Sequence, residues 1–311
     1  MVLFAQAAKK PIRVGLLVWA NTEQRGSLEM ALMEGLRDQG YVEGKNLTME
    51  HRYVIGDGAL MDENARQLAA LKLDVIVTTC SPSTLAAKKA TNLTPIVIAA
   101  VADPVRQHLI ASLPRPGENV TGLSSHAEEV LPNMLKLFAS ILPRPAPPVA
   151  VFVHSSNPIH PLMWKKVDLL AQQMKLKVVR TDIDKSSEIP GAFESAVASR
   201  AGALFVLPDD PLFFNHRVRI VELAVKNRLP AFYCASEFVE AGGLIRYGEN
   251  LRGTYRNAAA YIDKIVKGEK PSTMPVAQPT RFELAVNRRT AKELGITFPS
   301  PILVLADQVV E

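Results

Sequence analysis

The fold is decided by the stretch from Asp74 to Thr84, which reads DVIVTTCSPST. Its first half is a short run rich in β-branched residues, typical of a strand that is buried on both faces of a parallel sheet. Its second half predicts the start of a helix, because Ser81 is a good N-cap residue and Pro82 suits the first helical position. A buried strand that runs directly into a helix is the basic unit of an α/β fold.

The same alternation continues on both sides of this stretch. The sequence predicts strands over 12–18, 47–53 and 95–100, and helices over 27–39 and 60–71. Strands that alternate with helices in this way predict a parallel sheet.

The pattern then starts again near Val149. Strands are predicted over 149–154, 177–181, 203–207 and 230–233, and helices over 162–174, 187–199 and 213–227. Segment 93–97 corresponds to 228–232, a repeat of about 135 residues, which is far longer than a solenoid repeat. The sequence therefore predicts an α/β protein made of two Rossmann-like lobes with parallel sheets.

The last part of the chain predicts a strand over 242–247, a helix over 250–267 and a strand over 281–287. A chain that returns to its first lobe must cross more than once, and we expect crossings around 122–125, 247–250 and 274–280. Several crossing strands make a hinge rather than a loose tether. We assign residues 11–123 and 248–278 to lobe 1, and residues 124–247 and 279–311 to lobe 2.

The first residues, Met1 to Ala8, read MVLFAQAA, and Ala5-Gln6-Ala7 has the form of a signal-peptidase site. We interpret residues 1–10 as a signal-peptide remnant, the alternative being a disordered tail. This interpretation predicts export to the periplasm.

The composition is that of an ordinary globular protein, with 48% hydrophobic and 22% charged residues. The net charge of +5 comes from scattered Lys and Arg, so we expect a solvated surface and no nucleic-acid partner. The two cysteines, Cys80 and Cys234, form neither a disulfide scaffold nor a metal-ligand spacing. We expect no metal and no cofactor.

Ligands of open parallel sheets bind beyond the carboxyl ends of the strands, and two facing lobes would share one cleft there. This rule selects the loops 19–25, 80–84 and 99–106 of the first half, and 154–160, 208–214 and 234–238 of the second half.

In the first half, the most specific candidate for a ligand-binding site is the predicted helix start at 81–84. Backbone N–H groups at Ser83 and Thr84 are expected to be free and, with Ser81, to receive a ligand carboxylate, although ordinary capping explains the same residues. Trp19 is expected to stack on an apolar ligand or to lie in the core. The remaining candidates of these loops are Asn21 and Asp103.

In the second half, Asp209, Asp210 and Glu237 are expected to pair with a ligand ammonium, unless they are solvated loop acids. His154 and Asn157 are candidates to hydrogen-bond a polar ligand, although a lone histidine is more often structural. Tyr233 is a second candidate for aromatic stacking, and Ser236 lies beside Glu237.

Several short motifs carry a family resemblance when they are taken in order. They are GLRDQGYVEGKN (35–46), DVIV (74–77), ADPV (102–105), PGENVTG (116–122), IVKGEKP (265–271), NRRTAKELGI (287–296) and Ala306-Asp307. From about Ile12 to Glu311 the chain resembles the substrate-binding proteins of the tryptophan/tyrosine-type ABC transporter family.

The resemblance implies a type I periplasmic-binding-protein fold whose two lobes close on a ligand. We expect the periplasmic substrate-binding component of an ABC importer, which captures a small carboxylate-bearing ligand, an amino acid or an aromatic compound, in the cleft between the lobes. The resemblance also implies two partners, a membrane permease and an ATPase, and a monomer suits delivery to them. In the family, the loops that match 81–84, Asp103, Asn157, 209–210 and 236–237 line the cleft. The loop from Trp19 to Glu23 departs from the pattern of the amino-acid binders.

Other functions remain as alternatives. A cysteine in each half is compatible with a two-base racemase, but the cysteines follow different strands of the repeat, so we expect no enzyme. The chain has no GxGxxG after its first strand and no GxxxxGK[ST], so neither a dinucleotide enzyme nor the transporter ATPase is expected. A sensor domain that feeds a membrane receptor is a further alternative. A transcription regulator is not expected, because no helix-turn-helix fits ahead of Ile12.

Overall fold

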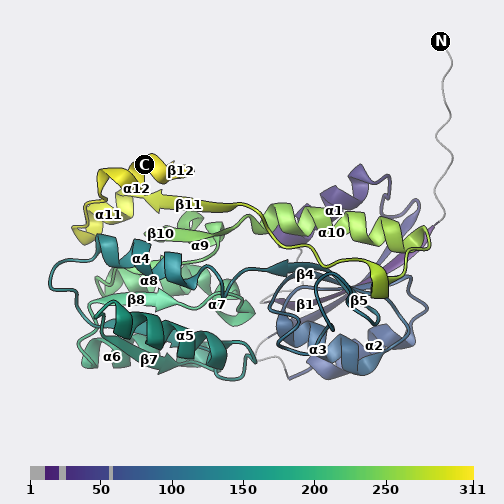
Figure 1. Cartoon of the computed structure of the whole chain (residues 1–311), viewed down its shortest axis with the longest axis horizontal. Helices are drawn as coiled ribbons and strands as arrows, with labels where there is room; N and C mark the ends of the chain where they lie inside the picture. The colour runs from purple at the N-terminus through teal and green to yellow at the C-terminus, as the bar shows by residue number, and fades with distance from the viewer. Residues whose placement is uncertain (1–10, 21–25, 56–58) are drawn as a thin grey trace, which may run out of the picture.

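The computed structural model describes residues 11–20, 26–55 and 59–311. Figure 1 shows two lobes side by side, and each lobe is an open β-sheet flanked by helices. Within the described residues, no helix is both long and apolar enough to span a bilayer. The two-lobed α/β fold predicted from the repeat is confirmed.

The first lobe is built on a five-stranded sheet in which every neighbouring pair is parallel. The order across the sheet is β2-β1-β3-β4-β5. The strands are β1 (Ile12–Ala20), β2 (Leu47–Ile55), β3 (Val75–Thr78), β4 (Ile96–Ala102) and β5 (Val120–Ser125). The predicted strands of this half are confirmed, and β5 adds the crossing segment to the sheet edge.

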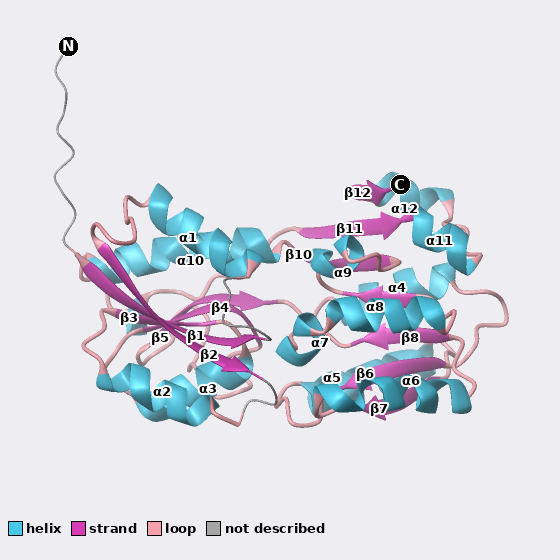
Figure 2. Ribbon diagram, turned by 180° about the vertical axis from the view of Figure 1, so that it is seen from behind, coloured by secondary structure: helices cyan, strands magenta, loops and turns pink. Residues whose placement is uncertain are grey.

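Helices cover both faces of this sheet, as Figure 2 shows. One face carries α1 (Ser27–Asp38) and α10 (Leu251–Val266), and the other carries α2 (Met61–Ala70) and α3 (Ser81–Ala90). Alternate residues of β1 point to opposite faces. Leu16 joins the core beneath α1 and α10, whereas Leu17 joins the core beneath α2 and α3.

A close helix contact at Gly35 sets the position of α1 against α10. A Cβ atom at Gly35 would lie 2.1 Å from the carbonyl oxygen of Arg256, which is backbone. We expect Gly35→Ala to lower the free energy of unfolding by about 2 kcal/mol, because the helices must move apart. Gly191→Ala is the matched control, since nothing lies within 4 Å of that Cβ position in α6 (Ile189–Ala198).

The control should be neutral or stabilising by up to about 1 kcal/mol, because alanine is the better helix former. Urea unfolding of both variants measures the difference. Equal effects of the two substitutions would contradict the close-packing explanation.

The second lobe is built on a seven-stranded sheet of order β12-β11-β10-β9-β8-β6-β7. Its strands are β6 (Val149–Val153), β7 (Val178–Asp182), β8 (Ala203–Val206), β9 (Ala231–Tyr233), β10 (Ile245–Glu249), β11 (Phe282–Asn287) and β12 (Gln308–Val310). Only the β10–β11 pair is antiparallel. The run β7-β6-β8-β9-β10 repeats the order β2-β1-β3-β4-β5, so the internal repeat is real.

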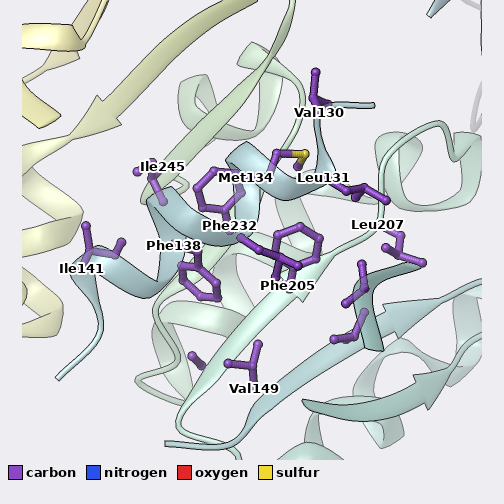
Figure 3. Close-up of a cluster of buried hydrophobic side chains, with 14 of the residues drawn as sticks. Val130, Leu131, Met134, Phe138, Ile141, Val149, Phe205, Leu207, Phe232 and Ile245 are labelled. Carbon is purple, nitrogen blue, oxygen red and sulfur yellow. The ribbon is translucent and has the colours of Figure 1, made fainter. Parts of the chain in front are cut away.

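A hydrophobic core that includes Phe138, Phe205 and Phe232 covers one face of the second sheet, as Figure 3 shows. Phe138 lies on a helix that covers the sheet, and its ring centroid is 5.5 Å from that of Phe232 and 6.2 Å from that of Phe205. The helices of this lobe are α4 (Leu131–Ile141), α5 (His160–Gln173), α6, α7 (Pro211–Asn215), α8 (Arg217–Lys226), α9 (Ser236–Glu240), α11 (Arg288–Leu294) and α12 (Ser300–Leu305). Two 3-10 turns, Ser186–Glu188 and Pro271–Thr273, complete the described elements.

The prediction of one helix over 213–227 is wrong. The chain forms α7 and α8, which are separated at His216, and α7 begins at Pro211. Asp210 is the N-cap of α7, since its Oδ1 accepts the backbone N–H of Phe213 at 3.0 Å. Because α7 begins at Pro211, Asp210 caps a helix instead of lying in an open loop.

Candidate functional site

A cavity of about 330 Å³ lies between the two lobes. It is bordered by the carboxyl ends of strands from both sheets, as the rule for parallel sheets predicts. Its aromatic walls are Trp19, Tyr53, Phe213, Phe214, Phe238 and Tyr255. Its charged walls are Glu29, Asp209, Asp210, Arg217 and Glu249. The cavity is therefore both aromatic and acidic.

The start of α3 differs from the prediction. The helix begins at Ser81, its N-cap is Cys80, and Pro82 occupies the second position. The backbone N–H of Thr84 is not free, because it donates to the carbonyl of Cys80 at 3.1 Å. The Ser83 hydroxyl accepts the N–H groups of Thr79 and Cys80 at 3.1 and 3.2 Å. The prediction that the backbone N–H of Thr84 is free is therefore wrong.

Asp209 links the two lobes. From the second lobe, its Oδ2 accepts the Ser81 hydroxyl at 3.1 Å and the Ala102 backbone N–H at 3.3 Å, both in the first lobe. Its φ of 59° lies in the left-handed region, which aspartate and asparagine tolerate better than most residues. Burial, together with the charges of the nearby Asp210 and Glu249, raises the pKa of Asp209 to about 8, although its hydrogen bonds oppose the rise.

Asp210 is the centre of a buried polar network. Its Oδ2 accepts from Asn157 Nδ2 at 2.9 Å and lies 2.8 Å from His154 Nδ1. Burial opposes ionisation of both groups, but their contact and charges prevail, so the pKa of Asp210 falls and that of His154 rises. The two form an ion pair inside the second lobe. Asn157 Nδ2 also donates to the carbonyl of Asp209 at 2.8 Å, so the network holds the Asp209 loop.

His160 completes this network and was not among the sequence candidates. Its Nδ1 accepts the backbone N–H of His154 at 2.9 Å, so its Nε2 carries the proton towards the carbonyl of Pro208, 2.9 Å away. Burial lowers the pKa of His160 and keeps it neutral. No role for His160 followed from the sequence, because its contact with the carbonyl of Pro208 joins residues 48 positions apart.

Glu249 is the main site residue that the sequence analysis missed. It ends β10, lines the cavity, and its Oε2 accepts the Thr254 hydroxyl at 3.2 Å. Burial raises the pKa of Glu249 to about 7. Arg246 fixes this strand end, because its Nη1 donates to the carbonyls of Gly248 and Glu249 at 3.0 and 3.3 Å.

Glu29 was also missed. It lies on α1 and lines the cavity, and its Oε1 is 2.8 Å from His51 Nε2 while its Oε2 accepts the Tyr53 hydroxyl at 3.0 Å. The sequence could have identified Glu249 as a candidate, because it follows the predicted strand 242–247 and lies in the predicted crossing 247–250. No local signal marks Glu29, which faces the cavity because of its helix packing.

Only some of the predicted site residues line the cavity. Among the predicted residues that the structure describes, Trp19, Asp209 and Asp210 line the cavity, whereas the lining excludes Ser81, Ser83, Thr84, Asp103, His154, Asn157, Ser236 and Glu237. Trp19 lies edge-on to His154 across the lobes, at 5.8 Å between ring centroids. Tyr233 is buried against Phe238 instead of facing a ligand. Asn21 and the expected signal remnant lie outside the described residues.

Asp103 and Glu237 are engaged locally. Asp103 Oδ1 accepts the backbone N–H of Arg106 at 3.0 Å, so it caps a turn and begins no helix. Glu237 is buried, and its burial raises its pKa, while the charge of Arg217 lowers it. Within the described part of the chain, no group of three His, Cys, Asp or Glu residues is arranged to hold a metal ion.

Comparison with known proteins gives a consistent result. Residues 14–310 match the model of a protein family described as ABC transporter substrate binding protein. A tyrosine-binding protein of Clostridioides difficile strain R20291 is 25% identical over 289 residues, which are 93% of this chain and 82% of that protein.

Two solved structures share the fold over nearly the whole chain. An ABC domain from Streptococcus pneumoniae, crystallised with L-Trp, has a TM-score of 0.85 and 24% identity, and the match covers 97% of this chain and 100% of that one. A ligand-free, open substrate-binding protein with adhesive properties from Clostridium difficile has a TM-score of 0.63 and 25% identity, covering 96% and 99%.

Proposed function

Because the chain belongs to the family of ABC transporter substrate-binding proteins, we propose that it captures an amine-bearing small molecule in the inter-lobe cavity for import. The observation that carries this proposal is the enclosed aromatic cavity with Asp209 and Glu249 in its wall. Relatives described as binding tyrosine and L-Trp support an aromatic amino acid as one such ligand.

We further propose that the lobes are in the closed arrangement. Asp209 reaches Ser81 and Ala102 across the cleft, and Asn215 Nδ2 donates to the carbonyl of Trp19 at 3.0 Å. The higher TM-score with the L-Trp complex than with the open protein supports the same view. Closure requires contacts that are made better in the closed state, and these bonds are such contacts.

The proposed partners are a membrane permease and an ATPase, and the proposed location is the periplasm. No catalytic step is proposed. Burial raises the pKa of both Cys80 and Cys234 to about 12, so neither is a thiolate at neutral pH. A two-base racemase would need one of them as a base.

A thermal-shift titration with L-tyrosine, L-tryptophan and their amines tests the proposal. Ligand at about 100 times its dissociation constant adds about 2.7 kcal/mol of stability, so the melting temperature should rise clearly. Ala20→Trp places a large ring at the cavity wall and should abolish the shift while the unliganded protein melts near the parent temperature. An unchanged shift in this variant would locate binding elsewhere.

A further inference from the structure

Among the described residues that line the cavity, acidic side chains outnumber basic ones. Glu29, Asp209, Asp210 and Glu249 are acidic, and Arg217 is the one basic side chain among the described lining residues. Two of the acids are matched within the protein. Glu29 lies against His51, and Asp210 lies against His154, each at 2.8 Å.

The other two acids have no basic partner among the described residues. Among the described residues, the carboxylate of Asp209 accepts from Ser81 and Ala102, and the carboxylate of Glu249 accepts from Thr254. A buried carboxylate without a cation is costly and normally takes up a proton or a positive ligand. Both wall positions therefore favour a cation in the cavity.

The wall of the same cavity offers a third acceptor. Ser125 lines the cavity, is only 4% exposed, and its Oγ has no hydrogen-bond partner in the described structure. Ser125 pairs in register with Ala102, whose N–H donates to Asp209. An ammonium group has three donors, and Asp209, Glu249 and Ser125 offer it three acceptors.

Arg217 is poorly placed to balance a ligand carboxylate. Its Nη1 donates to the carbonyl of Phe214 at 3.0 Å, and its guanidinium carbon lies 5.0 Å from the Phe214 ring centroid. The positive charge of Arg217 also acts on Glu237, whose pKa it lowers. The expected carboxylate site at Thr84 is already used by the helix cap.

We propose that the cavity selects an aromatic amine that lacks a carboxylate, with its ammonium group held by Asp209, Glu249 and Ser125. This inference rests on the proposed function, and it narrows the ligand from any amine-bearing small molecule to an aromatic amine without a carboxylate. The raised pKa values of Asp209 and Glu249 are consistent with it, because a proton takes the place of the cation when the cavity is empty.

Three probes with one ring test the inference by calorimetry: tyramine, L-tyrosine and 3-(4-hydroxyphenyl)propionate. Tyramine carries only the amine, tyrosine carries both groups, and the propionate carries only the acid. We expect tyramine to bind at least about tenfold more tightly than tyrosine, since a buried unpaired carboxylate costs binding energy. The propionate should not bind. The indole series of tryptamine, L-tryptophan and indole-3-propionate repeats the comparison with a larger ring.

Asp209→Asn and Glu249→Gln should each weaken the binding of the amine about 30-fold, because each leaves the ammonium short of a charged partner. Asparagine tolerates the left-handed backbone at 209, so the loop should fold as before. Glu222→Gln, at an exposed residue of α8, is the matched control and should change nothing. Melting temperatures without ligand confirm that each variant is folded.

Tighter binding of the amino acid than of the amine in both ring series would overturn the inference and leave the proposed function standing. Binding of the acid alone, or amine binding that is insensitive to both carboxylate variants, would also overturn it. If neither ring series gives any binding, the inference is overturned together with the aromatic ligand of the proposed function.

Discussion

Asp210→Ala should lower the free energy of unfolding by about 3–5 kcal/mol, the usual cost of removing one partner of a buried ion pair. The change leaves the charged ring of His154 buried without its carboxylate and removes an acceptor from Asn157. It also removes the N-cap of α7, where Phe213 N–H donates to Asp210. Denaturant unfolding of the purified protein measures the loss.

Asp182→Ala is the control for this prediction, because Asp182 forms its ion pair with Arg180 on an exposed strand. A surface ion pair contributes about 0–1 kcal/mol, so the control should remain close to the parent protein. A loss below about 1 kcal/mol for Asp210→Ala would show that the network does not support the second lobe in the way its geometry suggests.

The affinity for tyramine should fall about tenfold or more between pH 8 and pH 6 from Asp209 alone, because ionisation changes tenfold per pH unit below a pKa. The sign follows from the direction of the shifts. Burial raises the pKa of Asp209 to about 8 and that of Glu249 to about 7 in the closed, ligand-free cavity. Binding an ammonium requires both to be ionised, so binding releases protons and strengthens as pH rises through 7 and 8.

The charged and titratable groups that face these two carboxylates do not reverse the expected direction of the pH dependence. Asp209 is faced by Asp210, Glu249, Cys80, Cys234 and Tyr255, none of which is basic. Near Glu249, the guanidinium of Arg246 is paired with Glu283 at 2.7 Å. An aliphatic ammonium stays charged up to about pH 9, so the ligand contributes little to the change.

Calorimetric titrations in the same buffers across this pH range provide the measurement, and Asp209→Asn should make the profile shallower, leaving only the dependence on Glu249. Asparagine removes the carboxyl group with the higher pKa of the two. It keeps the shape of the side chain, so hydrogen bonds with Ala102 and Ser81 stay possible. An affinity that is constant from pH 6 to pH 8, or that rises as the pH falls, would contradict protonation of the carboxylates in the empty cavity.

The fold was largely predictable because its signals are local. Runs such as Val75–Thr78 and Val149–Val153 are buried on both faces, so their composition alone identifies them as strands. The short elements after residue 287 were not predicted, because α11, α12 and β12 have at most seven residues each and gain order from packing. The break at His216 was missed for a related reason, since the periodicity continues from α7 into α8.

The site was predictable only in its location. The rule of strand ends found Trp19, Asp209 and Asp210, but no sequence pattern distinguishes Asp209, which faces the first lobe, from Asp210, which faces His154. Which partner each side chain meets depends on residues 50 to 130 positions away, such as Asn157 and Ser81. The free N–H predicted at Thr84 was wrong because Cys80 had taken the capping position from Ser81.

A crystal structure of the protein with tyramine tests the central claim most directly. The account predicts the ring among the aromatic walls of the inter-lobe cavity, with its nitrogen about 3 Å from the carboxylates of both Asp209 and Glu249. A ligand bound outside this cavity, or one whose nitrogen points away from both carboxylates, would contradict it.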